Sequence, residues 1–146
     1  MHMQGEPGTM QTAPTYSDVV QDVAEFLVQR LAAVSAAGID LDRVIIDPGF
    51  GFGKTAEQNF ELLARLEVLC NQSQPVLVGL SRKSMISNVL DRLPEQRMVA
   101  SVALALMAVE RGARIVRVHD VAATFDALSM WQTTRHALSQ SQGQPI

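Results

Sequence analysis

Four short apolar segments with the composition of β-strands divide this sequence, and they constrain its fold more than any other feature. They are residues 1–4, 44–46, 76–80 and 115–118. Their spacing of about 30 to 40 residues is that of one strand followed by one helix. Strands that alternate with helices favour a parallel sheet covered by helices. The sequence therefore predicts an α/β fold, and both part of a (β/α)8 barrel and an open doubly wound sheet satisfy this pattern.

Helix signals fill the intervals between the first three strand segments. Ser17 or Asp18 can cap a helix whose apolar residues recur at helical spacing until Gly38 ends it. A capping box that begins at Thr55 predicts a second helix, with leucines at positions 62, 63, 66 and 69.

Two further helices are expected in the rest of the chain. Pro94 suits the first turn of a helix that runs to Gly112. Its expected buried residues include Val99, Val102, Ala103, Leu106 and Val109. A last helix carries Phe125, Leu128 and Trp131, and a polar tail is expected over residues 139–146.

The most informative local sequence is Asp-Pro-Gly-Phe-Gly-Phe-Gly-Lys at residues 47–54, which we call the glycine loop. It follows an apolar strand directly and begins with a carboxylate. Its three alternating glycines allow positive φ angles and a close approach of the backbone to a ligand, while Phe50 and Phe52 supply flat apolar surface. A ligand-binding loop between a strand and a helix is the interpretation that this combination favours.

Two better-known phosphate-binding motifs do not fit the glycine loop. Gly53-Lys54-Thr55 resembles the end of a phosphate-binding loop, but the position that needs the first glycine holds Pro48. A dinucleotide-binding fingerprint fails as well, because Lys54 stands where its last glycine belongs.

Polar side chains stand at the carboxyl ends of three predicted strands. Asp47 ends the second strand, Lys83 follows the third, and Arg117 and His119 end the fourth. Arg117 and His119 are two residues apart and therefore face the same side of the sheet. Parallel α/β proteins bind their ligands at this edge, so these four residues are candidates for one site.

Composition excludes several classes of protein. The 146 residues are 47% apolar and 18% charged, as expected for one globular domain. A net charge of −3 gives no basic face for nucleic acid or an anionic membrane. The single Cys70 fits a reducing, cytoplasmic environment. No apolar run is long enough for a signal peptide or a membrane span, the longest being residues 102–109.

The sequence resembles the C-terminal half of the dihydropteroate synthase family. The matching segments are Met1-His2-Met3-Gln4-Gly5, the glycine loop, Gly79-Leu80-Ser81-Arg82-Lys83-Ser84 and Arg117-Val118-His119-Asp120. Their order and spacing cover nearly the whole chain, so residues 1–138 would form the half-domain. The family's first half, with its own substrate-binding loops, has no counterpart here.

The resemblance implies a TIM barrel of which this chain supplies about four β/α units. It also implies a transferase of folate biosynthesis and a sulfonamide target. The enzyme joins 6-hydroxymethyl-7,8-dihydropterin diphosphate to 4-aminobenzoate and releases diphosphate. Mg²⁺ is expected to assist through the diphosphate and the missing half, and no metal ligand is expected in this sequence.

The same resemblance assigns roles to the candidate residues. Asp47 would accept hydrogen bonds from the aminopyrimidine edge of the pterin. Lys83 would meet the pterin carbonyl and ring nitrogen. Arg117 and His119 would hold the diphosphate leaving group, since arginine binds phosphate in a bidentate manner. Lys83, Arg117 and His119 are thus the expected catalytic residues.

The other expected residues bind substrate or support the loop. Phe52 would line the aminobenzoate slot, and the resemblance adds Gly51 and Met1 to the substrate-binding set. Ser84, before a short possible helix, would bind the aminobenzoate carboxylate or act simply as an N-cap, and these readings use the same atoms. Lys54 is expected to support the loop rather than touch substrate.

A non-catalytic half-barrel that folds, dimerises or binds pterin without turnover is the alternative function. Four β/α units would leave open sheet edges at residues 1–4 and 115–118. We therefore expect either a homodimer or association with an N-terminal half. The family's own dimer contact is expected on the outer helices, over residues 94–112 and 124–136.

Overall fold

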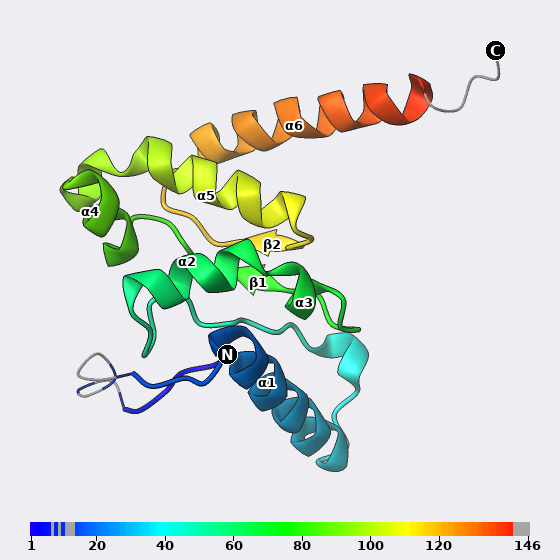
Figure 1. Ribbon diagram of the computed structural model, residues 1–146. Helices are drawn as coiled ribbons and strands as arrows, with labels where there is room; N and C mark the ends of the chain where they lie inside the picture. The colour runs from blue at the N-terminus through cyan, green and yellow to red at the C-terminus, as the bar shows by residue number, and fades with distance from the viewer. Residues whose placement is uncertain (7, 9, 11–13, 142–146) are drawn as a thin grey trace.

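The computed structural model describes all residues except 7, 9, 11–13 and 142–146. Helices α1 (Val19–Ala36), α2 (Ala56–Ala64) and α5 (Met98–Glu110) lie side by side along a small parallel sheet (Figure 1). Helix α6 (Val121–Ser141) packs on α5 and projects beyond it. The predicted α/β class is confirmed.

Regular strand structure is shorter than predicted. β1 (Leu77–Val78) pairs in parallel with β2 (Ile115–Val116). Residues 44–46 contribute one parallel bridge, between Ile46 and Val76. Residues 1–4 form no regular strand, although the His2 N–H donates to the Asp47 carbonyl at 2.9 Å. Beyond this bond Gly5, with φ of 75°, turns the chain away from the sheet.

The first two predicted helices are present, and the structure shows which residues cap them. Asp18, not Ser17, caps α1, because its Oδ1 accepts the N–H groups of Val20 and Gln21. The capping box at the start of α2 is confirmed. The predicted second helix ends earlier than its leucines suggested, and a separate short helix, α3 (Glu67–Cys70), follows.

The segment after β1 contains more breaks than predicted. It forms α4 (Ser84–Leu90) and then a 3-10 turn, η2 (Pro94–Gln96), before α5 begins at Met98. Pro94 therefore opens the 3-10 turn and not the α-helix. A further 3-10 turn, η1 (Leu41–Arg43), precedes the glycine-loop strand, and α6 continues to Ser141 within the predicted tail.

The buried face of α5 differs from the prediction. Val99 is 75% exposed and Ala103 is also exposed, while the buried residues are Ser101, Leu104, Ala105 and Ala108. Helix α5 is apolar on nearly every side, so its pattern does not mark one face. Most of its buried residues have small side chains, with Leu104 as the exception, and Val99 faces outward.

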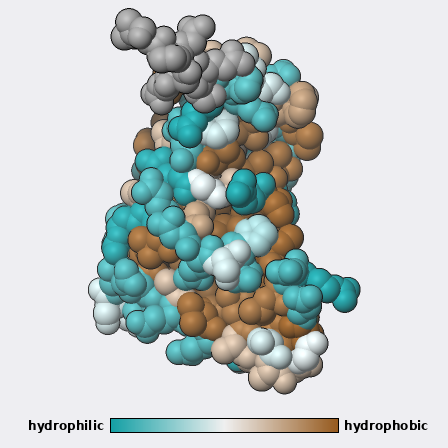
Figure 2. Space-filling view, turned by 90° about the vertical axis from the view of Figure 1, so that its right-hand side faces the viewer, coloured by the Kyte–Doolittle hydropathy of each residue, from teal (hydrophilic) through white to brown (hydrophobic). Residues whose placement is uncertain are grey.

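The core lies between the helices and one face of the sheet. Ile46, Val76 and Val78 are buried in the same cluster as the apolar residues of α1 and α2. Ile45, which alternates with Ile46, is 49% exposed, and Leu77 is only half-buried. The opposite face of the sheet is thus less covered, and Figure 2 shows hydrophobic residues gathered down one side of the molecule.

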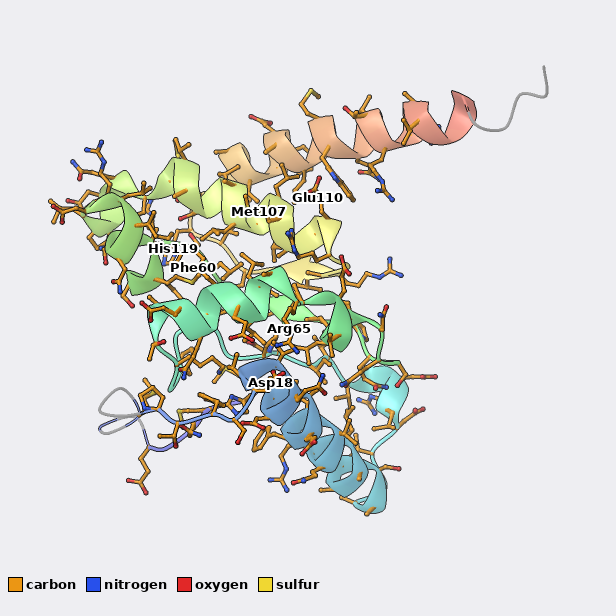
Figure 3. The ribbon with its side chains drawn as sticks, in the orientation of Figure 1. Asp18, Phe60, Arg65, Met107, Glu110 and His119 are labelled. Atoms are coloured by element: carbon orange, nitrogen blue, oxygen red, sulfur yellow. The ribbon has the colours of Figure 1, made fainter. Side chains whose placement is uncertain are left out.

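Ion pairs between exposed groups join the first helices. Arg65 binds Asp18 at 2.8 Å and Glu61 at 2.6 Å, and Figure 3 shows Asp18 and Arg65 facing each other between α1 and α2.

Among the helices that the structure describes, none is long and apolar enough to cross a membrane.

Candidate functional site

The glycine loop is shaped by close backbone contacts that only glycine permits. Gly49 and Gly53 have φ of 70° and 62°. A Cβ at Gly49 would overlap the carbonyl oxygen of His2, and one at Gly53 would overlap that of Gln4. The N-terminal segment therefore lies directly against the loop. The predicted close backbone approach is present, although it is made to the protein's own chain.

Side-chain donors satisfy most carbonyl groups of this loop. Lys54, only 2% exposed, donates to the carbonyls of Gly49 at 2.9 Å and Phe52 at 3.2 Å. The Tyr16 hydroxyl donates to the Gly53 carbonyl at 2.6 Å. The structure thus agrees with the prediction that Lys54 supports the loop.

The Lys83 side chain contacts the glycine loop directly, against Gly51. Its ammonium donates to the Phe50 carbonyl and lies 4.7 Å from the centroid of the Phe52 ring. Burial lowers the pKa of Lys83 to about 8, with Asp47 opposing the shift and Arg117 adding to it. Lysine, carboxylate and arginine from three segments are therefore within electrostatic reach of one another.

Asp47 is half-buried and oriented by its own loop. Its Oδ1 accepts the Gly49 N–H at 2.7 Å, which directs the carboxylate at the carboxyl end of its strand. A carboxylate has several lone-pair positions, so this single bond leaves acceptor capacity for a ligand.

Arg117 lies across the end of the neighbouring strand. A Cβ at Gly79 would come within 2.8 Å of Arg117 Nη2, so the missing side chain of Gly79 makes room for the guanidinium. Arg117 is exposed, and its backbone N–H donates to the Val78 carbonyl at 2.9 Å. This places a fixed cation beside Lys83.

The segment that leads from β2 into α6 is tied to the segment after β1 by two contacts. Ser81 Oγ lies 3.2 Å from the backbone nitrogen of His119 and 3.0 Å from its Nδ1. Arg82 forms a bidentate pair with Asp120, at 2.6 and 3.1 Å. Figure 3 shows His119 on this segment. We call residues 79–82 and 117–120 together the arginine corner.

Backbone strain and further hydrogen bonds mark Arg82. Its φ is 59°, which is uncommon for a residue with a side chain. Its N–H donates to Ser101 Oγ at 2.9 Å, and its carbonyl accepts from Arg97 Nη1 at 2.9 Å. Three elements thus hold Arg82 in this conformation, as expected for a strained residue at a functional site.

Ser84 is exposed and is the first residue of α4. The N-cap is Lys83, which makes no side-chain capping bond, so the simple N-cap reading of Ser84 is wrong. A role in carboxylate binding stays a prediction.

The predicted residues fall into three groups. Asp47, Gly51 and Phe52 belong to the glycine loop, the Lys83 side chain packs on Gly51 and Phe52, and Arg117, which lies against Gly79, is within electrostatic reach of Lys83. His119 belongs to the arginine corner with Ser81. Met1 is 57% exposed next to His2, beyond the other side of the loop.

Sequence reasoning missed several supporting residues. His2 was not among the predicted site residues, yet its ring is buried and its Nδ1 lies 2.9 Å from Lys54 Nζ. Asn59, Arg82 and Asp120 were not singled out. Arg82 and Asp120 adjoin the predicted residues Lys83 and His119 in the sequence, but no local pattern pairs two residues that are 38 positions apart. The bond from Asn59 to the loop depends on how α2 folds back, which no local pattern reveals.

The residues around Asp47 do not have the character of a metal site. Within the described part of the chain, no group of three or more His, Cys, Asp or Glu residues is placed to hold an ion. Asp47 is the carboxylate beside Lys83 and Arg117, and two cations next to one carboxylate do not suit Mg²⁺, which prefers several oxygen ligands. The residues present therefore do not fit a Mg²⁺ site.

A carboxylate, two cations and an aromatic ring at the carboxyl edge of a parallel sheet are typical of an α/β enzyme that binds an anionic heterocyclic ligand. The chain belongs to the pterin binding enzyme family, whose model matches residues 1–119.

Relatives with known names agree with this family. The chain is 54% identical over 137 residues to the dihydropteroate synthase of Haemophilus influenzae, covering 94% of this chain and 50% of the relative. It resembles the Yersinia pestis enzyme solved with a sulfonamide drug complex, with TM-score 0.90, 45% identity, and coverage of 93% of this chain and 50% of that one.

Structures of the Xanthomonas albilineans dihydropteroate synthase with different ligands also match this chain. Its complex with 7,8-dihydropteroate matches with TM-score 0.84 and 50% identity, over 99% of this chain and 50% of that one. Its structure with 4-aminobenzoic acid matches with TM-score 0.84 and 52% identity, over 99% and 48%. This chain therefore spans about half the length of the relatives that it matches.

Proposed function

We propose that this chain is the C-terminal half of a dihydropteroate synthase barrel and carries much of its substrate site. The reaction joins 6-hydroxymethyl-7,8-dihydropterin diphosphate to 4-aminobenzoate. The aminobenzoate nitrogen bonds to the pterin methylene carbon, the carbon–oxygen bond to diphosphate breaks, and the nitrogen loses a proton. The observation that carries the proposal is the meeting of Asp47, Lys83 and Arg117 beside Phe52, in a chain that belongs to the pterin binding enzymes.

The pterin would be read by Asp47 and Lys83. Asp47 is oriented by Gly49 and can accept the paired donors of an aminopyrimidine edge. Lys83 donates to the Phe50 carbonyl, which holds its ammonium in place beside Asp47 for a pterin carbonyl or ring nitrogen. With its pKa lowered to about 8, Lys83 is still mostly protonated at neutral pH and donates hydrogen bonds.

The diphosphate would be held by Arg117 and His119. Departure of diphosphate leaves positive character on the pterin methylene and negative charge on the leaving oxygens. Arg117, lying over Gly79, offers a fixed bidentate donor for those oxygens. The Ser81 hydroxyl contacts His119 Nδ1, and when it donates to that nitrogen, Nε2 carries the proton and would serve as a second donor.

The aminobenzoate would lie on the loop side of the site. Phe52 lines its ring, with Gly51 leaving room beside it, and Ser84 in the first turn of α4 binds the carboxylate. Met1 would contribute from the exposed end of the N-terminal segment. Relatives solved with 4-aminobenzoic acid and with 7,8-dihydropteroate support this substrate pair.

The barrel itself would be completed by another half. Residues 1–138 would supply about four β/α units, in which 1–4, 44–46, β1 and β2 are neighbouring strands. The half-exposed Ile45 and Leu77 would then face the barrel interior. The outward apolar residues of α5 and α6, such as Val99 and Phe125, suit a homodimer contact. Mg²⁺ would bind through residues outside this chain, and no step above depends on it.

The test is to measure diphosphate release by this chain alone and in a completed barrel, with pterin binding followed by calorimetry. We expect turnover in the completed barrel. Asp47→Asn places a donor against donors, so it should weaken pterin binding by about 2–4 kcal/mol. Equal affinity of variant and parent would remove Asp47 from the site. Pterin binding without turnover in the completed barrel would instead support the non-catalytic half-barrel.

A further inference from the structure

Two polar side chains that bind the glycine loop are almost fully buried. Lys54 and Asn59 are each 2% exposed. Burying an ammonium and an amide is unfavourable unless every polar atom finds a partner. Both side chains find their partners in the loop and in the residues next to it, so two buried polar groups serve one turn.

The ammonium of Lys54 has three acceptors for its three N–H groups. These are the carbonyls of Gly49 and Phe52 and the Nδ1 of His2 at 2.9 Å. Burial and the nearby Lys54 charge lower the pKa of His2 to about 4, so its ring is neutral and can accept at Nδ1. The His2 ring packs edge-on against Phe26 of α1, with centroids 4.9 Å apart. Lys54 therefore joins the loop, the N-terminal segment and α1.

Asn59 completes the support from the first turns of α2. Its Oδ1 accepts the Gly51 N–H at 2.7 Å, and its Nδ2 donates to the carbonyls of Thr55 at 2.6 Å and Lys54 at 3.3 Å. The middle of the glycine loop is thus fixed to the helix that follows it.

The two carbonyls that Lys54 binds do not depend on it equally. The Gly49 carbonyl also accepts the Phe52 N–H at 3.1 Å, and the Gly49 N–H is held by Asp47. For the Phe52 carbonyl, Lys54 is the donor that the structure records. Removing the ammonium would therefore disturb Phe52 more than Asp47.

We propose that Lys54, together with Asn59, is a positioning residue that sets the Phe52 ring against Lys83 and so determines aminobenzoate binding. This inference rests on the proposed function. Lys54 touches no substrate; it acts through the Phe52 carbonyl, while Lys83 contacts the Phe52 ring and the Phe50 carbonyl. Pterin binding, which is assigned to Asp47, should be affected much less.

The test compares Lys54→Met with Arg65→Met in the completed barrel. Arg65 is a matched control, since it is also a cation beside α2 with two side-chain partners but lies away from the loop. We expect Lys54→Met to raise the KM for 4-aminobenzoate about tenfold, with the KM for pterin diphosphate changed less than twofold. Arg65→Met should change neither. A folded Lys54→Met enzyme with an unchanged aminobenzoate KM, or with both KM values raised equally, would overturn the proposal.

Two further measurements keep the proposal testable. Amide hydrogen exchange at residues 49–53 should accelerate in Lys54→Met and not in Arg65→Met, and this holds even if the parent protein shows no synthase activity. Unchanged exchange at these amides would overturn the positioning role. If Lys54→Met does not fold, Asn59→Ser should show the same KM pattern at about threefold, and a purely kcat effect there would contradict it.

Discussion

The glycine loop and the arginine corner bring functional side chains to one edge of the sheet, but they are held in different ways. The loop is fixed by buried Lys54 and Asn59. The corner is fixed by a partly exposed pair, Arg82 with Asp120, whose side chains are 31% and 13% exposed. Buried, fully paired polar groups specify geometry more strictly than solvated pairs do. The loop half of the site is therefore pre-organised within this chain.

The corner has the opposite character because of its place in the sheet. β2 pairs with β1, and in the described part of the chain no strand pairs with its other edge. Arg117 and His119 are exposed beside that edge. A further strand from a completing half would lie against them and reduce their contact with water, which strengthens their interaction with an anion. If the proposed function holds, we expect the loop to bind pterin in this chain alone, whereas diphosphate binding at the corner should require the completed barrel.

The largest expected effect is a loss of stability when the packing of the glycine loop is disturbed. Gly49→Ala should lower the free energy of unfolding by roughly 4 kcal/mol, because the Cβ overlaps the His2 carbonyl and φ is 70°. Urea unfolding of the purified protein measures this. Gly38→Ala is the matched control, since φ is 79° with no atom within 4 Å of its Cβ, and it should cost about 1 kcal/mol. Equal losses for the two variants would show that the loop is not rigidly packed.

A smaller effect is expected at the corner. Arg82→Met should lower the free energy of unfolding, because Asp120 loses a bidentate partner in a partly buried position. It should also lower turnover in the completed barrel, since Lys83 and His119 adjoin this pair. Arg65→Met removes a more exposed pair and should lower the free energy of unfolding less, without loss of turnover. If both variants lose the same stability and both keep full turnover, the corner has no positioning role.

The same contrast explains what could be predicted from the sequence. The capping box at Thr55, the α/β class and the glycine loop are local signals, and each is present in the structure. The lysine at position 54 was also interpreted correctly, because a lysine that ends a glycine-rich turn lies near that turn's carbonyls.

The errors arise where tertiary packing decides. Val99 was expected to be buried, yet α5 is apolar all round and places its small residues inward. Strands at 1–4 and 44–46 were expected, yet their pairing is limited to a few bonds. The Arg82–Asp120 pair joins residues 38 positions apart, and no local pattern signals such a contact.

The smallest predicted effect is the pH dependence of the free energy of unfolding. It should come from Lys54 and Lys83 and not from the arginines of the corner. Burial, with Lys83 nearby, lowers the pKa of Lys54 from 10.5 to about 7. Between these values the unfolded chain binds more protons than the folded one, so the free energy of unfolding should rise with pH, on the order of 1 kcal/mol per pH unit. Below about pH 7 both states bind the proton, so Lys54 no longer makes the free energy of unfolding change with pH. Arginines stay charged throughout, so the arginines of the corner add no pH dependence in this window.

Urea unfolding at several pH values would test this prediction. In Lys54→Met the rise should begin only near pH 8, where Lys83, with its pKa of about 8, starts to lose its proton in the folded state. Arg82→Met should keep the onset near pH 7, because it leaves both lysines in place. A parent protein whose stability is flat between pH 7 and 8, or a Lys54→Met variant with the parent's slope there, would show that Lys54 is not the buried titrating group. The loop would then be held by hydrogen bonds alone, and its difference from the corner would be one of burial rather than of charge.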